Sequence, residues 1–459
     1  MSAQQTEITS EHTPTCGRVI SHDKISSISI VRHLCGLYKA QGRYDEAEEV
    51  LGGTMDDFIP ALRQDSESAI TIVRDLVDLF RDQGKFNRAK EIYQQAVSGL
   101  EKTLGRQHFT TLSMVFEFGS FLRKNGQLQE AEEVYVQSLT GIAAGTKNPT
   151  LSVLCILNEL GVVYAKQRKL NQAVEIYRHA VQGYVKVVGS DHLSTTTAVL
   201  NLGAVYKDQG KLKDAARMLN WGLSGLEKAH GTANKRTIET AKQLTALYMR
   251  ERNLGEAQRV CAKALNGSET TLGKCHEGTL AAVLDMGIIH RDQGQFKESE
   301  QMLQRAFDGY QQTNHNLLPL VLNALGTVHA LQGDYDKADE EYDWATECLN
   351  KKEERDELLN LIVTYNKGNV LQAHGRLEEA EKHCEKALEG FQNLAGHRHL
   401  TTMAAVLKLG AIYQEQGKFK EVEDLYRTAL RSQEEVSKKL SKDDDNDAAL
   451  YFQRMSIVY

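Results

Sequence analysis

Apolar residues recur along this chain with the period of an α-helix. In the segment Ala173–Ala180, the residues Ala173, Ile176, Tyr177 and Ala180 fall at i, i+3, i+4 and i+7, which is one helix face. The sequence has no alternating β-branched runs joined by Asn-Gly turns. Only four prolines occur in 459 residues, and proline breaks helix interiors. The pattern therefore predicts an all-α chain.

The helical segments repeat at a constant spacing. A residue that ends the first helix of each predicted hairpin recurs in steps of 42 residues, with one step of 39 that contains Pro319. These residues are Gly42, Gly84, Gly126, Arg168, Gly210, Arg252, Gly294, Gly333, Gly375 and Gly417. Glycine suits a left-handed helix end because it lacks a β-carbon. We therefore expect strain at Arg168 and Arg252, and a local kink or change of pitch near Pro319.

Other positions keep the same register. A small residue, such as Ala173, follows each turn by five positions, and a glycine, such as Gly161, often precedes it by seven. Small side chains let two helix backbones approach closely, so these positions predict the contact between the two helices of a hairpin. In the links between hairpins, Thr111, Thr195, Thr279 and Thr402 are expected to cap the next helix. A histidine three residues earlier is expected to bond the turn.

The pattern L-G-x-x-Y-x-x-Q-G-K-x-x-x-A resembles the tetratricopeptide repeat in its long, kinesin-light-chain form. It is clearest in the fifth repeat, at Leu202, Gly203, Tyr206, Gln209, Gly210, Lys211 and Ala215, and the resemblance covers roughly residues 28 to 432. It implies a right-handed α-solenoid of about ten helical hairpins, with ligands held in a concave groove. We expect a disordered tail over residues 1–27, the superhelix over 28–436, and an acidic link with a C-terminal segment over 437–459. That last segment either caps the final repeat or folds back into the groove.

Composition narrows the functional classes. The chain has 55 Lys and Arg against 62 Asp and Glu, a net charge of −7, which argues against nucleic-acid binding by bulk charge. No apolar run approaches the roughly 20 residues that span a bilayer, and the first 30 residues contain no signal-peptide pattern. Seven scattered cysteines without a CxxC pair indicate a reducing compartment. We therefore expect a cytoplasmic protein that binds neither nucleic acid nor membrane.

The resemblance implies that positions 2, 5, 9, 12 and 13 of each first helix face the groove. The numbering makes position 11 the bulky residue of the inter-helix column, such as Tyr164, His290 or His329. Over the first seven repeats bases outnumber acids at these positions, and the last three repeats are rich in amides. A basic groove attracts carboxylates or phosphates, and asparagine side chains can bond a peptide backbone. The alternative is that these bases only complement the helix dipole at its C-terminus. The candidate groove residues are Arg74, Arg81, Arg123, Lys124, Asn158, Lys166, Asn201, Lys207, Arg250, Arg291, Asn323 and Asn369.

No catalytic or cofactor motif is recognisable: there is no Walker loop, GxGxxG, HExxH or GxSxG. We expect no metal and no cofactor, because the spacing of His374, His383 and Cys384 does not suit zinc. His290 and His329 are expected to be core residues, with a buried acid/base pair as the alternative. The predicted function is a scaffold or adaptor that recognises acidic or extended peptide segments of a protein partner.

The alternative is an enzyme without a linear motif, or a sensor, that acts on a small anionic or phosphorylated molecule in a pocket inside the superhelix. Its acid or base would be one of the carboxylates Asp82, Asp208 and Asp292, which recur beside bases at groove position 13. The sequence identifies no catalytic residue for this reading.

Overall fold

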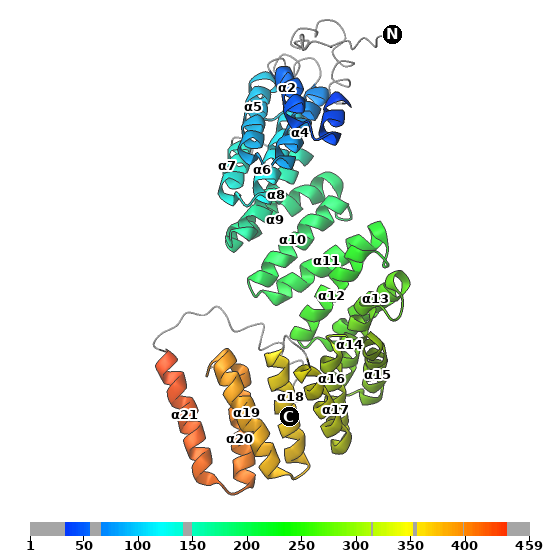
Figure 1. Cartoon of the computed structure of the whole chain (residues 1–459), viewed down its shortest axis with the longest axis vertical. Helices are drawn as coiled ribbons and strands as arrows, with labels where there is room; N and C mark the ends of the chain where they lie inside the picture. Colours follow the sequence, from blue (N-terminus) through cyan, green and yellow to red (C-terminus); the bar gives the residue numbers. More distant parts are fainter. Residues whose placement is uncertain are drawn as a thin grey trace, which may run out of the picture. The chain divides into compact units, whose positions relative to one another are not determined.

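The computed structural model describes residues 33–55, 66–140, 149–313, 315–351, 356–397 and 399–437. These residues form ten successive helical hairpins, and the described ranges contain no β-strand. Figure 1 shows the helices following one another in sequence order. The all-α fold and the hairpin repeat are thus confirmed. The expected N-terminal tail and residues 438–459 lie outside the described part of the chain.

The two helices of a hairpin are called first and second below. The first helices are residues 33–40, α4 (Ser66–Asp82), α6 (Phe109–Lys124), α8 (Leu151–Lys166), α10 (Leu193–Asp208), α12 (Lys235–Arg250), α14 (Glu277–Asp292), α16 (Leu318–Gln332), α18 (Glu357–Ala373) and α20 (Leu400–Glu415). The second helices are α2 (Tyr44–Met55), α5 (Phe86–Leu104), α7 (Leu128–Leu139), α9 (Leu170–Val188), α11 (Leu212–His230), α13 (Leu254–Leu272), α15 (Phe296–Thr313), α17 (Tyr335–Asn350), α19 (Leu377–Ala395) and α21 (Phe419–Ser437).

The chain divides into two units, Met1–Met218 and Leu219–Tyr459, and the boundary falls within α11. Within unit 1, α8 contacts its hairpin partner α9, the preceding α7, and the first helices α6 and α10. Within unit 2, α16 has the corresponding set of neighbours in α17, α15, α14 and α18. Each repeat therefore packs on the adjacent repeats, as in a solenoid. Among the described residues, no helix combines the length and the apolar character that crossing a bilayer requires.

The contact between the two helices of a hairpin depends on a glycine. The ring of Tyr177 on α9 lies against Gly161 of α8, where an added β-carbon would be 2.7 Å from the ring. The same contact recurs between Tyr342 and Gly326, at 2.8 Å. The small residues after each turn are buried as well, and Ala173 and Ala338 are fully inaccessible. The expected close approach of the two helices is thus confirmed.

All ten turns between first and second helices contain a residue with positive φ at the expected place. Eight are glycines, and the other two are Arg168, at φ 61°, and Arg252, at φ 59°. The hydrogen bonds are equivalent in both kinds of turn: Asn253 N–H donates to Tyr248 O over 2.9 Å, as Lys211 N–H does to Tyr206 O. The arginines therefore occupy the glycine conformation, which costs a residue with a β-carbon about 1–2 kcal/mol.

The link between hairpins differs from expectation in one respect. The histidine caps the first helix: Nδ1 of His192 accepts from the N–H of Ser194 over 3.1 Å. The threonine lies inside the helix, and Thr195 Oγ1 donates to the carbonyl of Gly189 over 2.7 Å. His108, His276 and His399 repeat the capping role. The prediction of threonine caps was therefore wrong, because an imidazole at the end of the link reaches the free N–H groups first.

The 39-residue step does not kink a helix. Pro319 lies in the first turn of α16, where no intrahelical hydrogen bond is lost. The missing residues of this shorter step are taken from both helices. Helix α15 has 18 residues, against 19 in α13, and α16 has 15, against 16 in α14. The expected kink at this proline is therefore not found.

Replacing Arg252 with glycine should raise the free energy of unfolding by about 1 kcal/mol, because glycine relieves the left-handed strain. The Arg252 side chain is exposed, so little else is lost. Urea denaturation followed by circular dichroism measures the change. Arg252→Ala is the matched control, because it keeps the β-carbon and should bring no gain. Equal effects of the two variants would contradict the strain.

Candidate ligand-binding face

The predicted groove residues lie on one face of the first helices, and hydrogen bonds join this face from one repeat to the next. Asn201 Nδ2 on α10 donates to Asn158 Oδ1 on α8 over 3.1 Å. In unit 2, Asn366 on α18 donates to Asn323 on α16 over 2.9 Å. Both bonds connect position 5 of one repeat with position 6 of the next. We call this set of bonds the inter-repeat ladder.

Three of the predicted ligand-binding arginines are bonded to carboxylates instead. Arg74 on α4 pairs with Glu117 on α6 at the ladder position. Arg123 pairs with Glu159 over 3.0 Å, and Arg81 pairs with Asp78 over 2.7 Å. Glu117 and Glu159 stand at position 6, one residue beyond a counted groove position. Sequence analysis missed them because it counted charge at five positions per helix only.

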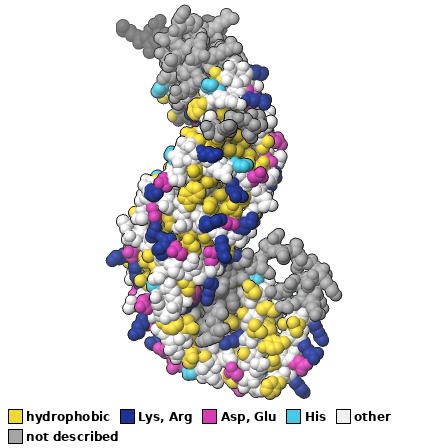
Figure 2. Space-filling model, turned by 180° about the vertical axis from the view of Figure 1, so that it is seen from behind, with side chains coloured by type: hydrophobic (Ala, Val, Ile, Leu, Met, Phe, Trp, Pro, Cys, Tyr) yellow, Lys and Arg dark blue, Asp and Glu magenta, His cyan; other side chains and the backbone are white. Residues whose placement is uncertain are grey.

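Three of the predicted lysines, all in unit 1, have different surroundings from these arginines. Lys124, Lys166 and Lys207 lie at the ends of α6, α8 and α10, all exposed, and none forms a salt bridge within the described ranges. Figure 2 shows basic and acidic side chains interspersed over the visible surface, rather than one continuous basic patch. Among the predicted groove residues of unit 1, the bases without a carboxylate partner in the described ranges are therefore these three separate lysines.

The predicted residues of unit 2 have other surroundings. Arg250 is half-buried at the end of α12. Arg291 on α14 is buried and pairs with Asp292 over 2.7 Å. Asn323 and Asn369 are 0% and 1% exposed. Sequence reasoning placed all four on an open face, whereas three of them lie in the interior.

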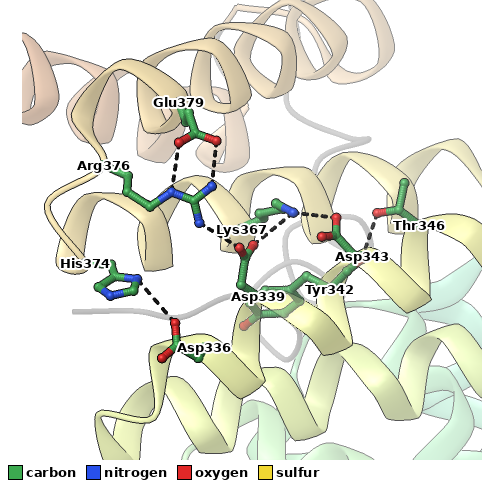
Figure 3. Close-up of polar contacts among 9 residues, drawn as sticks. All are labelled: Asp336, Asp339, Tyr342, Asp343, Thr346, Lys367, His374, Arg376 and Glu379. Carbon is green, nitrogen blue, oxygen red and sulfur yellow. Dashed lines mark hydrogen bonds and ion pairs between the residues drawn. The ribbon is translucent and has the colours of Figure 1, made fainter.

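An ion network centred on the buried Lys367 joins α17, α18 and α19 (Figure 3). Lys367 Nζ lies 2.9 Å from Asp339 Oδ1 and also pairs with Asp343, both on α17. Arg376, in the turn after α18, pairs with Asp339 over 2.9 Å and with Glu379 over 2.6 Å. Burial acts to raise the pKa of Asp339, but the hydrogen bonds and charges of Lys367 and Arg376 outweigh it, and the pKa lies below its usual value. The network holds α18 against the preceding repeat.

The two histidines in the inter-helix column are core residues with separate partners. His290 Nδ1 lies 2.6 Å from Gln295 Oε1. His329 lies between Glu341, at 2.8 Å, and Glu300, at 3.4 Å. The hydrogen bond to Glu341 raises the pKa of His329, against the opposing effect of burial. Burial likewise raises the pKa of Glu341. The two histidines do not form an acid/base pair with each other.

The carboxylates considered for catalysis are also paired. Asp82 lies 2.9 Å from Lys39 Nζ, and that hydrogen bond lowers the pKa of Asp82. Asp208 lies 3.9 Å from Arg168 NH1. A carboxylate held in its ionised form by a cation is a weaker general base.

Two protein-family models match this chain. A tetratricopeptide repeat model matches residues 152–228, 236–312, 281–351 and 360–435, and a second model of that repeat matches residues 72–110. The chain belongs to the tetratricopeptide repeat family. No curated protein matches it in sequence.

Solved structures of similar fold include a kinesin-light-chain-like protein of Podosopora anserina with nearly identical TPR-like repeats. It is 21% identical and has a TM-score of 0.39, with 45% of this chain and 97% of that chain covered. The apo quorum sensor NprR of B. thuringiensis is 14% identical, with a TM-score of 0.49 and 84% and 99% covered. A Rap protein complexed with Competence and Sporulation Factor is 16% identical, with a TM-score of 0.36 and 86% and 99% covered. Likenesses at this level concern the fold alone.

Replacing Lys367 with methionine should lower the free energy of unfolding by about 2 kcal/mol, because it takes one of the two cationic partners from the largely buried Asp339 carboxylate and leaves it with Arg376 alone. Lys337→Met is the control, since Lys337 lies on the neighbouring helix α17 and forms an exposed pair with Asp334. We expect a much smaller loss for the control. Urea unfolding of both variants measures the two losses of unfolding free energy. Similar losses would show that the network stabilises the protein no more than an exposed ion pair does.

The site around His329 should make stability depend on pH. A raised pKa means that the stabilisation is full below the unfolded pKa of about 6.5 and is lost as pH rises through the folded pKa. The unfolding free energy of the native chain, relative to His329→Gln/Glu341→Gln, should therefore fall as the pH rises above about 6.5. Urea titrations at several pH values measure this difference, and a constant difference would refute the assignment.

Proposed function

We propose that the first-helix face of unit 1 binds an acidic, extended segment of a protein partner. The observation that carries this proposal is the row formed by Lys124, Lys166 and Lys207 on successive first helices, all exposed and without carboxylate partners among the described residues. The neighbouring arginines on the same face are occupied by Glu117 and Glu159. Lysines left unpaired on a face that otherwise pairs its charges are suited to an acidic ligand.

The ladder beside these lysines supplies hydrogen bonding for a peptide backbone. In the Asn158–Asn201 bond, Asn201 donates and Asn158 accepts. The Nδ2 donors of Asn158 and the Oδ1 acceptor of Asn201 form no hydrogen bond with the described residues, and both side chains are half-exposed. A donor and an acceptor side by side match the N–H and C=O groups of an extended chain. The lysines would then select charge, and the amides would bind backbone of any sequence.

The alternative of an enzyme or sensor for a small anionic molecule has no specific support in the described residues. The carboxylates that it requires are bonded to Lys39 and Arg168 in unit 1. We therefore favour macromolecular recognition.

Reversing two of the lysines, in Lys166→Glu/Lys207→Glu, should weaken binding of an acidic peptide at least tenfold and reduce its dependence on salt. The probe is a fluorescein-labelled twelve-residue peptide of alternating Glu and Gly, with a Gln-Gly peptide for comparison. Fluorescence anisotropy with the full chain at low and at physiological salt gives both quantities.

The matched control is Arg178→Glu/Lys186→Glu, which makes the same change in net charge at two exposed positions of the second helix α9. It should retain most of the affinity. Equal weakening by both double variants would show a non-specific charge effect, and no weakening by either would refute the lysine assignment.

A further inference from the structure

One face of unit 2 is far more deeply buried than the equivalent face of unit 1. The ladder bond Asn323–Asn366 has the same repeat positions and nearly the same length as Asn158–Asn201. Yet Asn323 and Asn366 are both 0% exposed, whereas Asn158 and Asn201 are half-exposed. The same side chains at the same repeat positions therefore differ in how deeply they are covered.

The described neighbours do not explain the difference. Helices α8 and α16 contact the corresponding set of helices, a partner, a preceding second helix and two first helices. Residues Leu318–Ala330 of α16 are nevertheless buried without interruption around the helix. On α20, in contrast, Leu407 occupies the same position 5 and is 63% exposed. An additional element must cover the face of α16 and α18.

The covered face is apolar and contains an amide that needs a partner. It includes Leu320 on α16 and Ile362 on α18, both buried. Asn369 is 1% exposed, and its side-chain amide lies beside Tyr365 but makes no hydrogen bond of normal geometry. A buried amide without partners costs about 1–3 kcal/mol. An occupant with apolar side chains and a peptide backbone would satisfy both features.

The chain itself contains a segment of this chemistry within reach. In unit 2 the residues outside the description are 314, 352–355, 398 and 438–459, and only the last run is long. Residues 438–447, with the acidic stretch Asp443–Asp445, would span about 33 Å if extended, against about 10 Å between packed helices. Residues 448–459, AALYFQRMSIVY, carry one charged side chain, Arg454.

We propose that residues 448–459 bind the apolar face of α16 and α18 as an intramolecular ligand. This site is separate from the lysine face of unit 1, and the proposal does not rest on the function proposed for that face. The segment competes with any external ligand for α16 and α18, so it acts as an internal inhibitor of this face.

The test measures access to one position of the face. Ala330 is at position 12 of α16 and is 3% exposed, and Ala165 is at position 12 of α8 and is half-exposed. In the full chain, Ala330→Cys should react slowly with a maleimide. Adding Phe452→Asp/Ile457→Asp should speed that reaction at least tenfold. Ala165→Cys is the control and should react at the same rate with or without these tail substitutions. Mass spectrometry of the labelled peptides separates these thiols from the native cysteines.

A synthetic peptide of residues 446–459, added in excess to the substituted chain, should restore slow labelling at position 330. Equal slow rates with and without the tail substitutions would overturn the proposal, because the face would then be closed by other packing. Protection that depends on protein concentration would also overturn it, in favour of a second copy of the chain. Neither result would affect peptide binding at Lys166 and Lys207, so the two proposals fail separately.

Discussion

The contact between an aromatic ring and a bare helix backbone sets the helix separation in four of the described hairpins, at Gly119, Gly161, Gly326 and Gly410. Tyr177 against Gly161 and Tyr342 against Gly326 leave no space for a β-carbon, so the separation of the two helices is fixed by covalent geometry rather than by adaptable side chains. The left-handed residue after each first helix then fixes the turn. Because both constraints recur with the sequence period, equivalent positions in successive repeats face the same way, and polar side chains meet across repeats.

The two units carry different side chains at these equivalent positions. In unit 1 the ladder positions carry charge and amide pairs that stay partly open, with Lys166 and Lys207 beside them. On α16 and α18 of unit 2 the same positions hold Asn323, Ala324, Tyr365 and Asn366, all of them buried. Identical backbone geometry therefore supports a polar face and an apolar face in one chain, and side-chain identity alone decides which ligand chemistry each can bind.

Most of the fold could be predicted from the sequence because its determinants are local. The turn at Arg252 and the buried Ala173 follow from spacing within one repeat. The ligand face was harder to predict, because pairing between repeats joins residues about 43 positions apart, as Arg74 and Glu117 do. Counting charges at five chosen positions cannot show which of the bases are paired with a carboxylate at a position outside that set, such as position 6. The burial of Asn323 depends on what covers it, which periodicity does not encode. The cap was misassigned because both His192 and Thr195 have side chains that can bond a helix start.

Lys367 restricts which repeat can precede the ninth repeat. In the fifth repeat the equivalent position is Leu202, a core residue, whereas the ammonium of Lys367 depends on two aspartates supplied by the repeat before it. Placed after any repeat that lacks those aspartates, this hairpin would bury a charge without a counterion. The repeats are therefore not interchangeable at this junction. Deleting or exchanging the repeat before Lys367 would remove the counterions of its ammonium group, so charge pairing restricts the order of the repeats.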